Sequence, residues 1–133
     1  MTPVIVPAYA AVLAFVYIYL AVRVIRLRQS HRVGIGHGGH ADLERAMRVH
    51  ANFSEYAPLG VLLLAFLEMQ SRPAWMIHLL ALALVAARSI HAHGVSQAKE
   101  DVRLRATGMI TTFAVLAVAG ALLLSTAIRA VAG

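Results

Sequence analysis

The chain contains four long apolar stretches separated by short polar segments. They cover residues 4–22, 53–70, 74–92 and 106–128, and the first contains no charged residue. Each is close to the roughly 20 predominantly apolar residues that a helix needs to cross the hydrocarbon core of a bilayer. The pattern therefore predicts an all-α fold, an integral membrane four-helix bundle with four transmembrane helices. Residues 1–133 are expected to form a single transmembrane domain.

Composition supports this interpretation. Apolar residues make up 60% of the chain and charged residues 14%, and the mean hydropathy is +0.74. A soluble domain carries about 25% charged residues, so a soluble fold is excluded. The net charge of +6 alone would suit nucleic acid, but no basic run is interleaved with aromatic residues in a polar segment. No nucleic-acid partner is therefore expected. The chain has no cysteine, so any thiol chemistry needs a thiol from a ligand.

The basic residues predict the orientation in the membrane. Six arginines follow the first apolar stretch, and Lys99, Arg103 and Arg105 follow the third. Only Arg72 and Arg129 belong to the opposite side. Because Lys and Arg concentrate in cytoplasmic loops, both basic loops are expected in the cytoplasm and both termini outside it.

A polar stripe lies on one helical face at the start of the second apolar stretch. At about 100° per residue, its five members fall within roughly a third of the circumference: Arg45, Arg48, Asn52, Glu55 and Tyr56. An ionised residue inside a span costs about 2.5–3.5 kcal/mol. Either a neighbouring helix, with Arg88 the obvious partner of Glu55, or a bound ligand must therefore complete the stripe. As a pocket it suits a small zwitterion, with Arg for a carboxylate and Glu for an ammonium.

The histidines give no metal prediction. Residues 34–40 (GIGHGGH) contain a G-x-G-x-x-G pattern, but no strand precedes it, so a flexible loop is expected rather than a dinucleotide site. His37 and His40 are conceivable ligands, yet nothing near them in the sequence supplies more. His91 and His93 are two residues apart on a helix and cannot chelate one ion.

Two further features concern packing. Small residues on the fourth stretch predict that helix backbones approach closely there: Gly108, Ala117, Gly120 and Ala121. Glu68, at the outer end of the second stretch, is interpreted as a carboxylate at the membrane interface.

The run from Glu44 to Leu59 reads E-R-x-x-R-x-x-x-N-x-x-E-Y-x-P-L. It resembles the signature of the MAPEG family, the membrane-associated proteins of eicosanoid and glutathione metabolism. The resemblance covers essentially the whole chain: four spans, a basic first loop and an Arg-rich start to the fourth span. Residues 88–94 and 103–109 are more similar to the compact bacterial branch than to the eicosanoid enzymes.

The resemblance implies a homotrimer of four-helix subunits that binds glutathione, as thiol co-substrate, between neighbouring subunits at the cytoplasmic side. Arg103 matches the arginine that activates the thiol from an adjacent subunit. Because the alignment needs a one-residue insertion, Arg105 remains the alternative. His91 and Val95 stand where the eicosanoid branch has two glutathione-contacting tyrosines. The residues expected at the glutathione site are Arg28, Arg48, Asn52, Glu55, Tyr56, Arg88 and His91.

The function expected on this basis is that of a glutathione-dependent transferase or peroxidase, embedded in a bacterial inner membrane and acting on lipophilic electrophiles from the bilayer. A thiol with a pKa of about 8.5 is mostly protonated at pH 7, and a neighbouring arginine favours the reactive thiolate. Two alternatives remain open. One is a non-catalytic membrane protein that keeps the pocket as a small-ligand-binding or packing site. The other is a His-based metal or haem protein.

Overall fold

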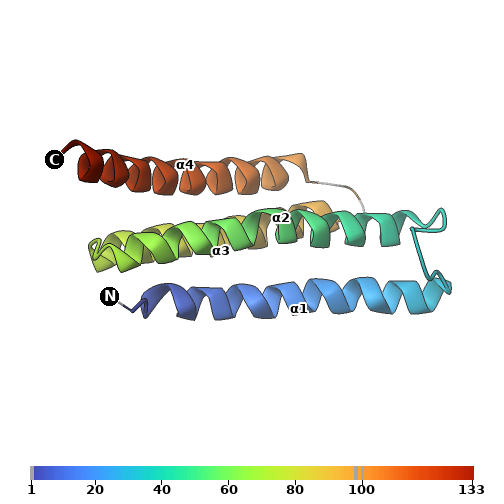
Figure 1. Ribbon diagram of the computed structural model, residues 1–133. Coiled ribbons are helices and arrows are strands. Elements are labelled where there is room, and N and C mark those ends of the chain that lie inside the picture. The colour runs from blue at the N-terminus through green and yellow to red at the C-terminus, as the bar shows by residue number, and fades with distance from the viewer. Residues whose placement is uncertain (1, 98, 100) are drawn as a thin grey trace.

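The computed structural model describes residues 2–97, 99 and 101–133, and this part of the chain is built from four helices (Figure 1). They are α1 (Ile5–His31), α2 (Ala41–Met69), α3 (Ala74–Ser96) and α4 (Val102–Ala132). The predicted all-α fold is confirmed. The helices extend beyond the apolar stretches: α1 continues past residue 22 to its basic end, and α2 begins well before residue 53.

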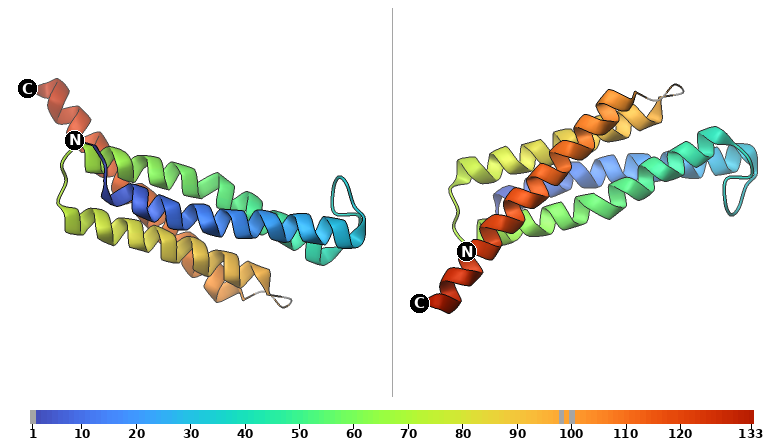
Figure 2. Two further views of the ribbon diagram at one scale, coloured as in Figure 1. Left: turned by 90° about the horizontal axis from the view of Figure 1, so that it is seen from below. Right: turned by 90° about the horizontal axis from the view of Figure 1, so that it is seen from above.

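The helices alternate in direction, and α2 and α3 lie between α1 and α4 (Figures 1 and 2). Helix α1 packs on α2 and α3, and α4 packs on α3 and α2. Both termini and the α2–α3 turn lie at one end, which we call the termini end. The α1–α2 loop, the end of α3 and the start of α4 lie at the other, which we call the loop end.

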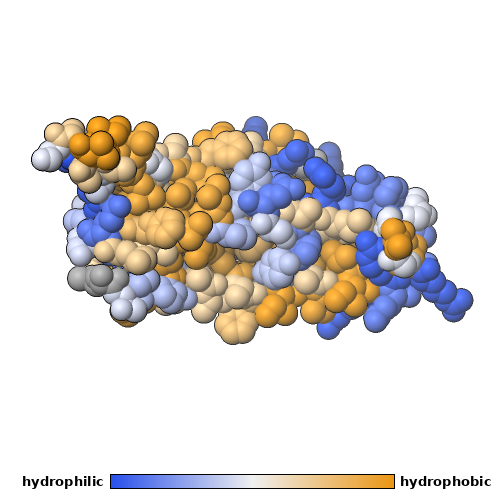
Figure 3. All heavy atoms as spheres, in the orientation of Figure 1, coloured by the Kyte–Doolittle hydropathy of each residue, from blue (hydrophilic) through white to orange (hydrophobic). Residues whose placement is uncertain are grey.

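The outer surface of the bundle is largely apolar. Hydrophilic residues gather at the loop end, and hydrophobic residues cover most of the rest of the face drawn in Figure 3. Large apolar side chains such as Phe15, Trp75 and Ile110 point outward. Lipid, unlike water, imposes no penalty on such a surface. Helices α1, α3 and α4 are each long and apolar enough to cross a membrane.

Helix α2 contains the remaining predicted span, residues 53–70, and lies alongside the other three. It is not among the helices that length and composition alone identify as candidate membrane spans. The reason is its composition: Asn52, Glu55 and Tyr56 interrupt the apolar sequence in the middle, and Glu68 does so near the end. The polar stripe lies on α2, and its residues lower the mean hydropathy of that helix.

Glu68 is a cap for another helix. Its Oε1 accepts hydrogen bonds from the backbone N–H groups of Val4 (2.7 Å) and Ile5 (2.6 Å), and its Oε2 accepts one from Val6 (2.8 Å). The first N–H groups of a helix have no partner within the helix, and a carboxylate there also suits the helix dipole. Glu68 is buried and joins α1 to α2, so the interpretation as a plain interfacial carboxylate was incomplete.

Helices α3 and α4 pack closely against each other at Gly108. A Cβ atom there would lie 2.6 Å from the Cβ of His91 and 2.7 Å from the carbonyl oxygen of Ala87. A side chain at this position is therefore excluded. The small-residue prediction is confirmed at Gly108 and wrong within the subunit at Gly120, where a Cβ would meet nothing within 4 Å. The two small residues beside it, Ala117 and Ala121, are exposed.

Candidate functional site

A polar groove lies at the loop end, between α2, α3 and α4. Its volume is about 490 Å³, within the range of roughly 300–1,000 Å³ that is usual for small-molecule sites. Most of the lining comes from the first half of α2, and one face each of α3 and α4 completes it. The lining residues are Ala41, Glu44, Arg45, Arg48, Asn52, Tyr56, His91, Val95, Arg105 and Met109.

The polar stripe of α2 supplies four of these residues. Arg45, Arg48, Asn52 and Tyr56 follow one another at intervals of three or four residues, which places them on one face of a helix. Glu55 is the exception. It is exposed and lies outside the groove, and its carboxylate makes no hydrogen bond or ion pair within residues 2–97, 99 and 101–133. The stripe therefore divides into a groove-lining set and one outward-facing carboxylate.

Arg88 lies beneath the groove and is completely buried, with 0% of its surface exposed. Its guanidinium donates hydrogen bonds to the Oδ1 of Asn52 and to the Oγ1 of Thr112 (3.3 Å). The same group lies 5.5 Å from the centre of the Tyr56 ring, within the range of a cation–π contact. The alternative in which Glu55 completes Arg88 as an ion pair is not formed among the described residues, because the amide oxygen of Asn52 and the hydroxyl of Thr112 accept the guanidinium's hydrogen bonds instead.

His91 connects the groove to the backbone of α4. It is 4% exposed, and its Nδ1 lies 3.1 Å from the carbonyl oxygen of Arg105. Because a carbonyl only accepts, Nδ1 carries the proton and donates it. The absence of a side chain at Gly108 allows α4 to approach His91 this closely. His91 and Val95, which replace the two tyrosines of the eicosanoid branch, both line the groove.

The two arginines considered for thiol activation lie in different places. Arg105 lines the groove of its own subunit. Arg103 is exposed and lines a separate shallow surface with Lys99, Asp101 and Val102. A role for Arg103 in the groove of an adjacent subunit stays a prediction.

Arg28 is engaged with the loop that follows α1. Its guanidinium donates hydrogen bonds to the carbonyl oxygens of Gly34 (3.2 Å) and Gly36 (2.9 Å) and also contacts the sulfur of Met47. It does not line the groove of its own subunit. Its expected contact with a ligand likewise stays a prediction.

Sequence reasoning missed the contribution of α4 to the floor of the groove. Thr112 and Met109 both contact Arg88, and Met109 also lines the groove. A signal was available: Thr111 and Thr112 form a hydroxyl pair in the middle of an apolar stretch, and a buried arginine needs acceptors.

The chain is thus an all-helical integral membrane protein with a polar groove built on its second helix. The family model of the MAPEG family matches residues 6–125, and the chain belongs to this family. It is also similar to inner membrane protein YecN of Escherichia coli, in strain K12 and in the O6:H1 strain CFT073. In both cases 35% of residues are identical over 108 residues, which is 81% of this chain and 81% of the relative.

Proposed function

We propose that the protein is a glutathione-dependent transferase or peroxidase that acts on lipophilic electrophiles in a bacterial inner membrane. The observation that carries the proposal is the convergence of Arg45, Arg48 and Arg105 on one groove beside apolar helix surfaces. Glutathione has two carboxylates, one ammonium and one thiol, so a groove rich in arginine suits its net negative charge.

The groove residues offer hydrogen-bonding groups that fit such a ligand. Arginine binds carboxylates through two parallel N–H donors, which is the role proposed for Arg48. Asn52 uses its Oδ1 for Arg88, and its amide nitrogen keeps two donors for a peptide carbonyl. The hydroxyl of Tyr56 can donate or accept. Arg88 acts through Asn52 as a positioning residue.

Glu55 supports the proposal of a shared site. An ionised carboxylate that faces lipid costs about 2.5–3.5 kcal/mol, yet Glu55 is exposed on a membrane-embedded bundle. We propose that a second copy of the chain covers this face, in a homotrimer. Glu55 then binds the ammonium of a ligand held between subunits, and Arg28 and Arg103 reach the same ligand across the interface.

Glutathione supplies the nucleophilic thiol, and the chain's role is to favour the thiolate. An arginine remains charged at neutral pH and cannot act as a base, so its contribution is electrostatic. Lowering a thiol pKa by two units corresponds to about 2.7 kcal/mol. Within one subunit Arg105 is the arginine on α4 that lines the groove, and we propose it for this task. If the positive charge beside the thiol comes from the neighbouring subunit, Arg103 of that subunit takes the same role.

A non-catalytic role is the second candidate, and the bond between Arg88 and Asn52 favours it. A stripe residue that already satisfies a buried arginine holds α2 against α3 without any ligand. The groove then serves as a packing device or as a binding site without turnover.

Calorimetry and product analysis on detergent-purified protein separate these functions. Glutathione is titrated into the protein, and conjugate formation with chlorodinitrobenzene is followed by chromatography. Binding with turnover is expected. Arg48→Gln should weaken binding about tenfold or more, since hydrogen bonds to charged groups contribute about 1.5–3 kcal/mol. Arg26→Gln is the matched control, because Arg26 is exposed at the same end but outside the groove.

Binding without turnover would support the non-catalytic role. Absence of binding would reject both the enzyme and a glutathione-binding role, and would leave the groove as a packing device.

A further inference from the structure

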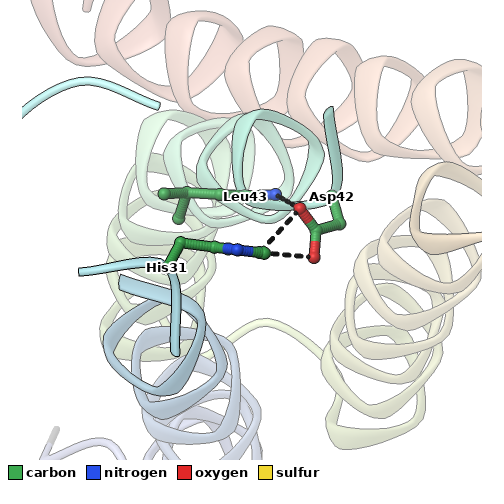
Figure 4. A network of polar contacts seen from close by, with 3 residues as sticks. All are labelled: His31, Asp42 and Leu43. Carbon is green, nitrogen blue, oxygen red and sulfur yellow. Dashed lines mark hydrogen bonds and ion pairs between the residues drawn. The ribbon is translucent and has the colours of Figure 1, made fainter. Parts of the chain in front are cut away.

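A cluster of two histidines and one aspartate lies at the loop end, where α1 ends and α2 begins. His31 is the last residue of α1, His40 directly precedes α2, and Asp42 lies in its first turn. The Nε2 of His31 lies 3.1 Å and 2.9 Å from the two carboxylate oxygens of Asp42, as Figure 4 shows. The rings of His31 and His40 are stacked, with centroids 3.9 Å apart and planes 13° from parallel.

We propose that His31, His40 and Asp42 form a binding site for a divalent transition metal ion of the zinc class. One potential ligand atom from each residue lies within 4.8 Å of the other two. Two imidazole nitrogens and a carboxylate oxygen are a usual donor set for Zn²⁺. Three protein ligands leave the fourth tetrahedral position for water.

The side chains have room to close around an ion. Zinc–nitrogen and zinc–oxygen distances of about 2.0–2.2 Å require ligand atoms roughly 3.3–3.5 Å apart. The Nε2 of His31 and the nearer carboxylate oxygen of Asp42 lie 2.9 Å apart, so they must separate by about half an ångström to take up an ion. Asp42 is 54% exposed at its side chain and His31 24%, and His40 is half-buried, so small rotations can bring the third ligand in. The stacked rings of His31 and His40 must turn relative to each other, because the nitrogen lone pairs of two parallel rings do not converge on one ion.

The backbone holds the three residues together without a metal. Arg32 ends α1 in the left-handed conformation (φ 57°), and three glycines with positive φ turn the chain back towards α2. The N–H of His40 donates to the carbonyl oxygen of His37 (2.9 Å), which closes the loop. The ligands therefore come from the end of α1, the first turn of α2 and the residue directly before α2.

Asp42 is also prepared as a ligand. Its Oδ1 accepts the backbone N–H of Leu43 (2.8 Å), which orients the carboxylate (Figure 4). A metal ion bound here would lie between His31 and Asp42, in place of the hydrogen bond that joins them.

Sequence reasoning did not find this cluster because His31 lies on another helix, nine residues before His40. A bound ion joins the end of α1 to the start of α2. That first turn of α2 also carries Ala41 and Glu44 of the groove, so metal binding is expected to stiffen one rim of it.

The test uses the full chain, purified in detergent through a tag without histidine and stripped of metal with a chelator. Zn²⁺ is titrated by calorimetry, and one ion per subunit is expected. His31→Ala and Asp42→Asn should each weaken binding about tenfold or more, since even indirect partners of a metal site cost 10–100-fold. His93→Ala is the control, because His93 is exposed on α3 and its side chain contacts Gln97, the residue that follows this helix.

Co²⁺ gives an independent readout, because its visible absorption reports tetrahedral coordination. The wild type should show this spectrum, His31→Ala should lose it, and far-ultraviolet circular dichroism should confirm that the variant is folded. The proposal is overturned if the wild type binds Zn²⁺ no better than His31→Ala. It is equally overturned if His93→Ala lowers the affinity as much as the cluster variants do.

Discussion

Arg88 on α3 donates a hydrogen bond to the amide oxygen of Asn52 on α2, beneath the groove. The cation is fully buried, and its other partners, Thr112 and Met109, are neutral as well. The bond fixes the orientation of the Asn52 amide, so that its nitrogen remains available to the groove. A packing contact thereby sets the geometry of the candidate site.

A double-mutant cycle measures this relationship. Because the donor is charged, Arg88→Met and Asn52→Ala should show a coupling free energy of about 1.5–3 kcal/mol in the free energy of unfolding. The measurement is denaturant unfolding in detergent micelles. A second cycle of Arg88→Met with Glu55→Gln should give a smaller coupling, because no ion pair joins these side chains and only a longer-range attraction acts between their charges. Equal coupling free energies in the two cycles would contradict the assignment of Asn52, rather than Glu55, as the partner of Arg88.

Glu68 should stabilise the bundle through α1. Glu68→Gln replaces a carboxylate that accepts three backbone N–H groups by an amide with one acceptor oxygen. The expected loss in the free energy of unfolding is about 1.5–3 kcal/mol. Hydrogen exchange should accelerate at the amides of residues 4–6. Glu44→Gln, at an exposed position in the same helix, serves as control, and a comparable loss there would rule out a specific cap.

Gly108 should tolerate no side chain. Gly108→Ala puts a methyl group into the contact with His91 and Ala87, and overpacking of this kind costs about 1–3 kcal/mol. Gly120→Ala meets open space on the same helix and should be neutral or slightly stabilising, because alanine favours helix. Thermal unfolding of the two variants checks this. Similar midpoints would show that α3 and α4 do not approach each other as described.

The orientation can be tested without background labelling, because the chain has no cysteine. Ile35→Cys and Gln97→Cys, both at the loop end, should resist a membrane-impermeant thiol reagent in intact cells, since basic loops remain cytoplasmic. Gln70→Cys, in the α2–α3 turn, should react. Labelling at residue 35 with protection at residue 70 would reverse the topology.

The helices were predictable because lipid demands long apolar stretches, and helical geometry places residues three or four apart on one face. That rule also put Arg48, Asn52 and Tyr56 in one groove. It could not separate Glu55 from them, because a helical wheel does not show where a neighbouring helix ends and solvent or lipid begins.

Contacts between distant helices were beyond such rules. Glu68 caps a helix more than sixty residues away, and Arg88 donates a hydrogen bond to the amide of Asn52 rather than to the carboxylate of Glu55. Both contacts depend on how the helices cross, and the spacing of residues along one helix does not determine the crossing. The cluster of His31, His40 and Asp42 escaped for the same reason, since a glycine-rich loop brings its members together.

Titration of the ultraviolet absorbance of the bound thiol against pH tests the claim that the groove binds glutathione and favours its thiolate. The bound thiol is expected to have a pKa well below about 8.5, the value for a free thiol. Arg105→Gln should raise that pKa again while glutathione stays bound, with Arg26→Gln as the unaffected control. If Arg103→Gln alone raises it, the activating charge comes from the neighbouring subunit. A bound thiol that titrates like free glutathione in the wild type would contradict the claim.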